Sequence, residues 1–252
     1  FAGNPAAVVP LERWLPDETM QQIAFENGLS ETAFFVPTAV PRRFQLRWFS
    51  PPLEVDICGH ATLATAHVIF HERGENAAEV SFESRSGLLG VTRRADGKLE
   101  LDFPVTPATL ETDPAVFAAV TAALGQPPQW LGRSRFDLFA VLANSEAVRT
   151  LKPDLARVAA LGHRGLIVTA RGGSDCDFVS RFFAPQTGIP EDPATGSAHC
   201  ALMPYWAAEL GRAQLHARQL SARSAELWCE LAGNRVKIAG NSVLYLRGEI
   251  RL

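Results

Sequence analysis

The sequence predicts an α+β fold with two similar halves, each an antiparallel sheet with a long helix that the sheet can wrap. The plan of strand, loop and helix start occurs twice. Arg47-Trp48-Phe49-Ser50-Pro51 leads to Gly59-His60-Ala61, and Arg181-Phe182-Phe183-Ala184-Pro185 leads to Gly196-Ser197-Ala198. Internal similarity of this kind indicates duplication, although chance likeness of two strand-to-helix connections is the alternative. With 252 residues, 47% of them hydrophobic, the chain can build a core in each half.

The first half begins with turn residues and a short strand, Ala6–Val9. A helix is expected over Asp17–Glu26, because Met20, Ile23 and Ala24 recur with helical spacing and Asn27-Gly28 can end it. The other elements expected here are the strands Thr32–Val36 and Phe44–Phe49, a helix from Gly59 to about His71, and the strands Glu79–Glu83, Leu88–Arg93 and Leu99–Phe103.

Pro104-Val105-Thr106-Pro107 is the best candidate linker, so we expect lobes at residues 1–104 and 105–245. A C-terminal strand at about 246–252 is expected to return to the first lobe. The elements expected after the linker are a helix over Asp113–Leu124, a strand over Leu138–Leu142, two short helices within Ser145–Leu161, the strands Leu166–Ala170 and Phe178–Phe183, a helix ending at Gly211, and the strands Gln219–Ala222, Glu226–Leu231, Arg235–Ile238 and Val243–Leu252.

Composition excludes several classes of function. The net charge is −3 without a basic cluster, which argues against nucleic acid or an anionic membrane as the main partner. No apolar run approaches the ~18 residues of a membrane-spanning helix. The four cysteines lie far apart without zinc-ligand spacing, so we expect reduced thiols, a cytoplasmic protein and no bound metal.

The stretch from Asp192 to Ser197 predicts the start of the second long helix. Asp192 followed by Pro193 is typical of a helix start, and the small residues Thr195-Gly196-Ser197 follow on the first turn. Unpaired N–H groups and the positive end of the helix dipole attract anions there. Pro204 should kink or break this helix. An anion site is therefore expected at Gly196-Ser197, and its counterpart in the first half is Gly59-His60.

Glu31 is a charged residue between apolar neighbours at the entrance of a strand. Its position alone permits two interpretations: the side chain faces solvent, or it has a chemical role. His60, Asp192 and Ser197 are the other polar residues at helix starts.

Four motifs occur in the order of a known family: Gly3-Asn4-Pro5-Ala6-Ala7-Val8, Asn27-Gly28-Leu29-Ser30-Glu31-Thr32-Ala33-Phe34, Cys58-Gly59-His60-Ala61-Thr62 and Glu191-Asp192-Pro193-Ala194-Thr195-Gly196-Ser197-Ala198. Together they resemble the phenazine-biosynthesis PhzF-like isomerases over nearly the whole chain. The resemblance implies a diaminopimelate epimerase-like fold, with two pseudo-symmetric lobes, each a sheet wrapped round a central helix, and a cleft between them.

The resemblance also implies the chemistry. Glu31 corresponds to the family's general acid/base, and His60 and Asp192 to other polar residues of its active site. The expected reaction is proton transfer between carbons of a small unsaturated or amino carboxylic acid, without cofactor or metal, by a homodimer. The residues expected to bind the substrate are Ser30, Gly59, Thr195, Gly196 and Ser197.

Simpler interpretations stay open. His60 could be only a helix-start residue, and Asp192 only an N-cap. Racemases of this fold use one cysteine in each half; Cys58 has no counterpart beside Asp192, so we expect it to be a small packed residue. The alternative function is a non-catalytic protein that binds small carboxylates.

Overall fold

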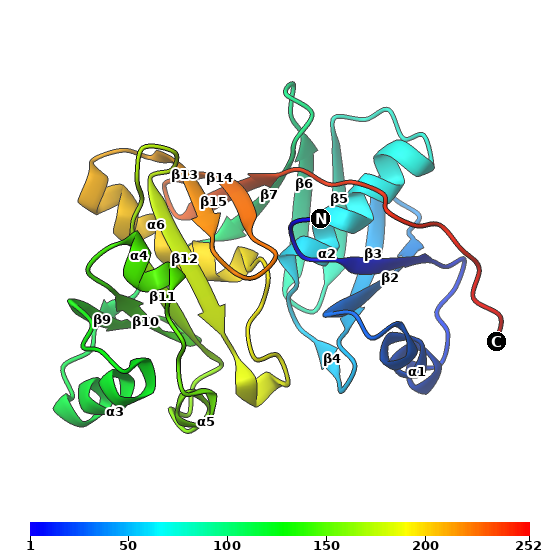
Figure 1. Cartoon of the computed structure of the whole chain (residues 1–252). Coiled ribbons are helices and arrows are strands. Elements are labelled where there is room, and N and C mark those ends of the chain that lie inside the picture. Colours follow the sequence, from blue (N-terminus) through cyan, green and yellow to red (C-terminus); the bar gives the residue numbers. More distant parts are fainter. The chain divides into compact units, whose positions relative to one another are not determined.

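The computed structural model describes residues 1–252, which form two compact units. The N-terminal unit contains Pro5–Asp102 and Ala239–Leu252, and the C-terminal unit contains Phe1–Asn4 and Phe103–Ile238 (Figure 1). Both units combine a sheet with helices, which confirms the predicted α+β fold.

The N-terminal unit has the strand order β1-β2-β3-β5-β6-β7, with β4 paired to β3. Its elements are β1 (Ala6–Pro10), α1 (Asp17–Asn27), β2 (Glu31–Pro37), β3 (Arg43–Phe49), β4 (Glu54–Val55), α2 (Gly59–His67) with a π-helical continuation η1 (Val68–Glu72), β5 (Glu79–Ser84), β6 (Gly87–Arg93) and β7 (Leu99–Pro104).

The C-terminal unit has the strand order β15-β14-β13-β12-β11-β10-β9-β8. Its elements are β8 (Thr109–Leu110), α3 (Pro114–Leu124), β9 (Trp130–Arg133), β10 (Asp137–Val141), α4 (Ser145–Arg149), α5 (Leu155–Ala159), β11 (Gly165–Arg171), β12 (Phe178–Phe183), η2 (Pro185–Thr187), α6 (Gly196–Leu210), β13 (Gln214–Gln219), β14 (Ala225–Ala232) and β15 (Arg235–Gly240).

The two units repeat one pattern of strand pairing. From β1 through β2, β3 and β5 to β6, the pairs are parallel, antiparallel, parallel and antiparallel. From β10 through β11, β12 and β13 to β14, the same four pairings follow in the same order. Chance similarity of two short segments would not reproduce a whole topology, so the predicted duplication is confirmed.

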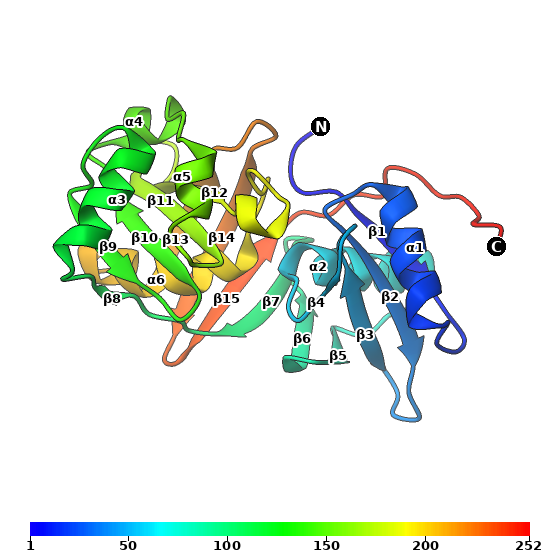
Figure 2. The same cartoon turned by 90° about the horizontal axis from the view of Figure 1, so that it is seen from below.

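Each unit packs its sheet against a central helix, which is α2 with its continuation η1 in the N-terminal unit and α6 in the C-terminal unit. In α6, every residue from Ala198 to Met203 is buried. Because successive residues of an α-helix point about 100° apart, uninterrupted burial requires neighbours on all sides. Helix α2 packs on β1, β2 and β6, and α6 packs on β13 and β14 (Figure 2).

Pro204 does not interrupt α6, which runs without a break from Gly196 to Leu210. A proline has no N–H, so the carbonyl of Cys200 loses its donor within the helix. The backbone N–H of Thr106 donates to that carbonyl at 3.0 Å. The linker segment therefore supplies the hydrogen bond that Pro204 cannot, and the predicted break is absent.

The matched arginines of the two halves make the same contact. Nε and Nη2 of Arg47 donate to the two carboxylate oxygens of Glu54, both at 2.7 Å. Arg181 makes the same fork to Glu191, at 2.7 and 2.9 Å. Each pair ties a strand, β3 or β12, to the segment that leads into the central helix: Glu54 precedes α2, and Glu191 precedes α6. Paired forks of this kind are strong and geometrically specific.

Replacing Arg181 is expected to destabilise the C-terminal unit. Its Nη1 also donates to the carbonyls of Val148 (3.2 Å) and Leu151 (2.6 Å), and its side chain is 12% exposed. Arg181→Met would leave these acceptors and Glu191 without a donor, at a cost of about 2 kcal/mol. Urea unfolding measures this loss, with the exposed Arg149→Met as the control; equal stability of the two variants would contradict the prediction.

Some strands differ from the sequence prediction. Strand β13 is Gln214–Gln219 rather than Gln219–Ala222, because Ser221 Oγ accepts from the backbone N–H of Ser224 and forms a turn that ends the strand. The short strands β4, β8 and β9 were not predicted. Two-residue strands carry no periodic signal, and β9 includes Gly132, a residue disfavoured in strands.

Residues 241–252 form no strand, so the prediction of a strand over Val243–Leu252 is wrong. Val243, Tyr245 and Leu246 are 84%, 83% and 76% exposed. A strand needs a neighbour for its backbone hydrogen bonds, and none pairs with this segment.

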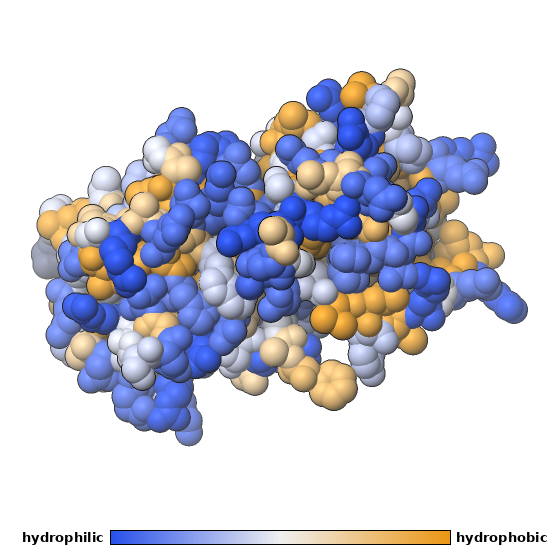
Figure 3. Space-filling view, turned by 90° about the horizontal axis from the view of Figure 1, so that it is seen from above, coloured by the Kyte–Doolittle hydropathy of each residue, from blue (hydrophilic) through white to orange (hydrophobic).

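On the face drawn in Figure 3, hydrophilic residues predominate and hydrophobic ones gather in separate areas. No helix in the structure combines the length and apolar composition that crossing a membrane requires.

Candidate active site

Glu31 is the first residue of β2 and follows the end of α1 closely. Gly28 ends that helix in the left-handed conformation, with φ of 59°, which glycine adopts without steric cost. Asn27 Nδ2 then donates to Thr32 Oγ1 at 3.0 Å, which fixes the entry into the strand. Glu31 is only 9% exposed, so the interpretation that it faces solvent is wrong. Ser30, which precedes it, is half-buried.

The start of α2 brings two more reactive side chains to Glu31. Cys58 is the extended N-cap residue, and its carbonyl accepts from Thr62 Oγ1 at 2.5 Å. Gly59 is buried at the first helical position, and His60 follows it. Nε2 of His60 lies 3.1 Å from Oε2 of Glu31, and Nδ1 lies 3.5 Å from Sγ of Cys58. The N-terminal unit thus joins a carboxylate, an imidazole and a thiol.

Charge is unevenly distributed in this cluster. Burial opposes a positive charge on His60, but Cys58 and the Glu31 carboxylate outweigh it and raise the pKa of His60 well above its ordinary value. Burial, with a smaller contribution from the Glu31 charge, raises the pKa of the Cys58 thiol to about 11. The Cys58 thiol therefore stays protonated at neutral pH, beside the His60 ring and the carboxyl group of Glu31. An acid and a base in contact can exchange protons with a bound substrate.

Asp192 in the C-terminal unit does not act as the predicted N-cap. Helix α6 begins at Gly196, and its N-cap is Thr195, whose side chain makes no capping hydrogen bond. The Asp192 carboxylate instead accepts from Asn4 Nδ2 at 2.6 Å and from Thr195 Oγ1 at 2.5 Å. These two donors hold the carboxylate in place.

Gln219 and Asn4 support the loop that precedes α6, and no role was predicted for either residue from the sequence. Gln219 is fully buried; its Oε1 accepts from the Thr195 N–H at 2.8 Å, and its Nε2 donates to the Asp192 carbonyl at 2.7 Å. Asn4 also donates to the carbonyl of Ala194 at 3.3 Å. Asn4 lies in the first family motif, which could have indicated that it has a role at the site. Gln219 lies in none of the four motifs.

Gly196 and Ser197 form the first turn of α6, where N–H groups lack partners within the helix. Arg164 Nη1 donates to Ser197 Oγ at 3.1 Å. The same guanidinium forks the buried carboxylate of Asp137, at 2.9 and 2.5 Å. A guanidinium held at a helix N-terminus favours a negatively charged ligand. No sequence pattern indicated Arg164.

The structure places the predicted residues in two sets. Ser30, Glu31, Gly59 and His60 belong to the N-terminal unit, and Glu31 meets His60. The second set belongs to the C-terminal unit and consists of Asp192, Thr195, Gly196 and Ser197. Cys58 is buried, in agreement with a packed residue, and it also touches His60.

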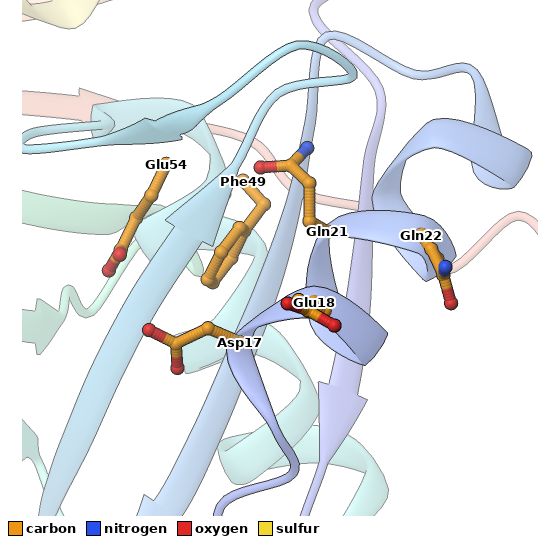
Figure 4. A pocket seen from close by; sticks show the side chains of 6 residues that line it. All are labelled: Asp17, Glu18, Gln21, Gln22, Phe49 and Glu54. Carbon is orange, nitrogen blue, oxygen red and sulfur yellow. The ribbon is translucent and has the colours of Figure 1, made fainter.

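A hollow of about 490 Å³ in the N-terminal unit contains none of these residues. It is lined by Asp17, Glu18, Gln21, Gln22, Phe49 and Glu54 (Figure 4). Asp17 and Glu54 are both paired with Arg47, and Gln21 donates to the carbonyl of Ser50 at 2.7 Å. The polar groups that line the hollow therefore hold the β3–β4 loop.

Comparisons with known proteins bear on the family of the chain. The family model described as "Phenazine biosynthesis-like protein" matches residues 1–248. An uncharacterized isomerase of Pseudomonas aeruginosa is 51% identical over 252 residues, which cover 100% of this chain and 94% of that protein. The crystal structure of a PhzF-family phenazine biosynthesis protein from Enterococcus faecalis superposes with a TM-score of 0.91 and 45% identity, covering 100% of this chain and 94% of that one.

A more distant match concerns the fold alone. The crystal structure of a probable proline racemase from Agrobacterium radiobacter has a TM-score of 0.59 at 12% identity, covering 94% of this chain and 82% of that one. The fold is thus similar to that of this probable racemase, and the sequence similarity over the full length is to phenazine biosynthesis-like proteins. The chain therefore belongs to the phenazine biosynthesis-like family of PhzF-like isomerases.

Proposed function

We propose that the protein is a cofactor-independent isomerase that moves a carbon-bound proton on a small unsaturated or amino carboxylic acid. The observation that carries this proposal is the buried contact of 3.1 Å between Glu31 and His60. Partial burial strengthens the electrostatic interaction of this pair with a bound substrate, and the 14% and 11% exposure of the His60 and Glu31 side chains lets the proton that Glu31 has taken exchange with solvent.

Glu31 takes the proton in this proposal. The substrate C–H bond breaks, an O–H bond forms on Glu31, and the electron pair shifts into the unsaturated system next to the substrate carboxylate. Return of the proton to another carbon, or to the opposite face of the same carbon, completes the isomerisation and regenerates the carboxylate. His60, whose pKa is raised, stays protonated and stabilises the negative charge that develops.

The substrate carboxylate binds at a helix start in this proposal. Gly196 and Ser197 offer N–H groups and a hydroxyl, with Arg164 beside Ser197. Thr195 differs from them, because its N–H and hydroxyl already bond Gln219 and Asp192. We assign it to holding the loop, with Asp192 as the polar group that acts on the substrate.

Solvent-deuterium exchange tests the activity. Small unsaturated and α-amino carboxylic acids would first be screened by thermal unfolding, where a ligand at 100 times its dissociation constant adds about 2.7 kcal/mol. Each stabilising acid would then be incubated with enzyme in D₂O and followed by proton NMR. Deuterium at a substrate carbon supports the isomerase. Stabilisation by several acids without exchange in any of them supports a carboxylate-binding protein instead.

That both sets of residues serve one substrate stays a prediction, and a double-mutant cycle tests it. Glu31→Gln and Asp192→Asn should each lower kcat/KM, and the double variant should lose less than the product of the two factors. Residues that act in one step couple by about 0.5–3 kcal/mol. Losses that multiply without coupling would indicate that Asp192 acts elsewhere. The homodimer and the cytoplasmic location also stay predictions.

A further inference from the structure

The cluster at the start of α2 has the composition of a transition-metal site. Glu31, Cys58 and His60 each offer one ligand atom, and these three atoms lie within 4.8 Å of one another. Thiolate, imidazole and carboxylate are the three ligand types that Zn²⁺ takes from proteins. The sequence did not indicate such a site, because Glu31 is distant along the chain and Cys58-Gly59-His60 lacks a standard ligand spacing.

Two of the three separations between the ligand atoms are close to those of a tetrahedral site, and the third pair, Sγ of Cys58 and the Glu31 oxygen, lies within 4.8 Å. Zinc bonds of about 2.3 Å to sulfur and 2.0–2.2 Å to nitrogen and oxygen place neighbouring ligand atoms about 3.3–3.6 Å apart. Here Sγ of Cys58 lies 4.0 Å from Nε2 of His60, and Nε2 lies 3.1 Å from Oε2 of Glu31. Side-chain rotations that move these atoms by a few tenths of an ångström bring both separations into that range.

A second observation points independently to a ligand. Oε2 of Glu31 is buried and accepts no aligned hydrogen bond, although Nε2 of His60 is close to it. His60 thus contacts this oxygen without an aligned hydrogen bond, and a metal ion held between the two side chains would bond to it directly. The side chains of His60 and Glu31 keep 14% and 11% exposure, so the cluster has an opening to solvent.

We propose that Glu31, Cys58 and His60 form a binding site for a thiophilic divalent cation such as Zn²⁺, and that the bound cation inhibits the enzyme. On binding, the Cys58 thiol and the protonated His60 ring each release a proton to solvent, and metal–sulfur and metal–nitrogen bonds form. Three protein ligands leave the fourth position to water or to a carboxylate. Inhibition rests on the proposed function, because the metal occupies the carboxylate that carries the proton; binding itself does not depend on that function.

Cobalt spectroscopy tests the binding without substrate. Co²⁺ added to the protein should give the near-ultraviolet charge-transfer band of a cobalt–thiolate bond, and Zn²⁺ should displace it. Cys58→Ala should abolish the band, and His60→Gln should weaken Zn²⁺ binding by at least about tenfold. Cys176→Ala, at another buried cysteine, is the matched control and should keep both. Absence of the band, or its persistence in Cys58→Ala, would overturn the site.

Turnover measurements test the inhibition separately. With an acid that exchanges deuterium, substoichiometric to equimolar Zn²⁺ should reduce the rate in proportion to occupancy, and a chelator should restore it. Occupancy without loss of rate would overturn the inhibitory role. A rate that rises with Zn²⁺ would overturn both that role and the cofactor-independent mechanism. If no acid exchanges, the proposed function fails, and the cobalt experiment still decides whether the site exists.

Discussion

Glu31→Gln is expected to lower the exchange rate at the substrate carbon by at least about a hundredfold while the protein stays folded. Glutamine fills the same space as glutamate but cannot accept and return a proton. The amide can still approach Nε2 of His60, which lies 3.1 Å from Oε2 in the native protein. The packing of β2 should therefore persist.

Two measurements separate a chemical role from a structural one. Exchange would be measured by proton NMR in D₂O, and folding by circular dichroism and urea unfolding. Glu26→Gln, an exposed glutamate on α1, is the matched control and should keep full exchange. Near-full exchange in Glu31→Gln would remove Glu31 as the proton carrier. Unfolding of the variant would mark Glu31 as structural.

The sequence predicted most of the fold because the relevant signals are local or repeated. Turn residues ended the strands, apolar periodicity located the helices, and the two Arg-to-Gly segments indicated the duplication. The structure added a reason for that likeness: Arg47 and Arg181 make the same carboxylate fork. The tail at 241–252 could not be predicted in this way, since alternating apolar residues do not reveal whether a neighbouring strand exists.

The candidate site was less predictable, because its contacts connect distant positions. Asn4 and Asp192 are separated by 188 residues, and the sequence around one does not indicate a contact with the other. Asp192-Pro193 therefore suggested an N-cap, whereas the Asp192 carboxylate bonds Asn4 and Thr195. The role of Gln219 could not be predicted for a further reason: in a sequence, an amide that will be buried looks like any other polar residue of a strand. The motif that contains Glu31 did indicate a site residue. The family resemblance connects motifs that are far apart in the sequence, which periodicity cannot do.

His199 is expected to make the protein sensitive to acid. It lies in α6 with no exposed surface, and its ring packs 5.8 Å from that of Phe178. Nδ1 lies 2.8 Å from the carbonyl of Thr195, which can only accept, so Nδ1 carries the hydrogen and Nε2 carries none. Nε2 is buried without a partner. Burial lowers the pKa of His199 to about 4, so the folded protein keeps this side chain neutral.

The direction of the effect follows from proton binding. In the unfolded chain His199 titrates near its ordinary pKa of about 6.5. Below that pH the unfolded state therefore binds a proton at His199 that the folded state does not bind. Stability is therefore unaffected above pH ~6.5 and falls by about 3 kcal/mol as the pH drops to ~4. His60, whose pKa is raised, acts in the opposite direction: its contribution is complete below pH ~6.5 and is lost as pH rises through its folded-state pKa.

His199→Asn isolates this contribution from all other titrating groups. Its Nδ2 can replace Nδ1 as donor to Thr195, but asparagine does not titrate. Urea unfolding of both proteins between pH 7 and pH 4 should show a wild-type stability that falls more steeply, by about 3 kcal/mol over the range. Parallel pH profiles would contradict the prediction, since they would mean that His199 accepts its proton in the folded state. A steeper wild-type profile would place the acid sensitivity in α6, the central helix of the C-terminal unit.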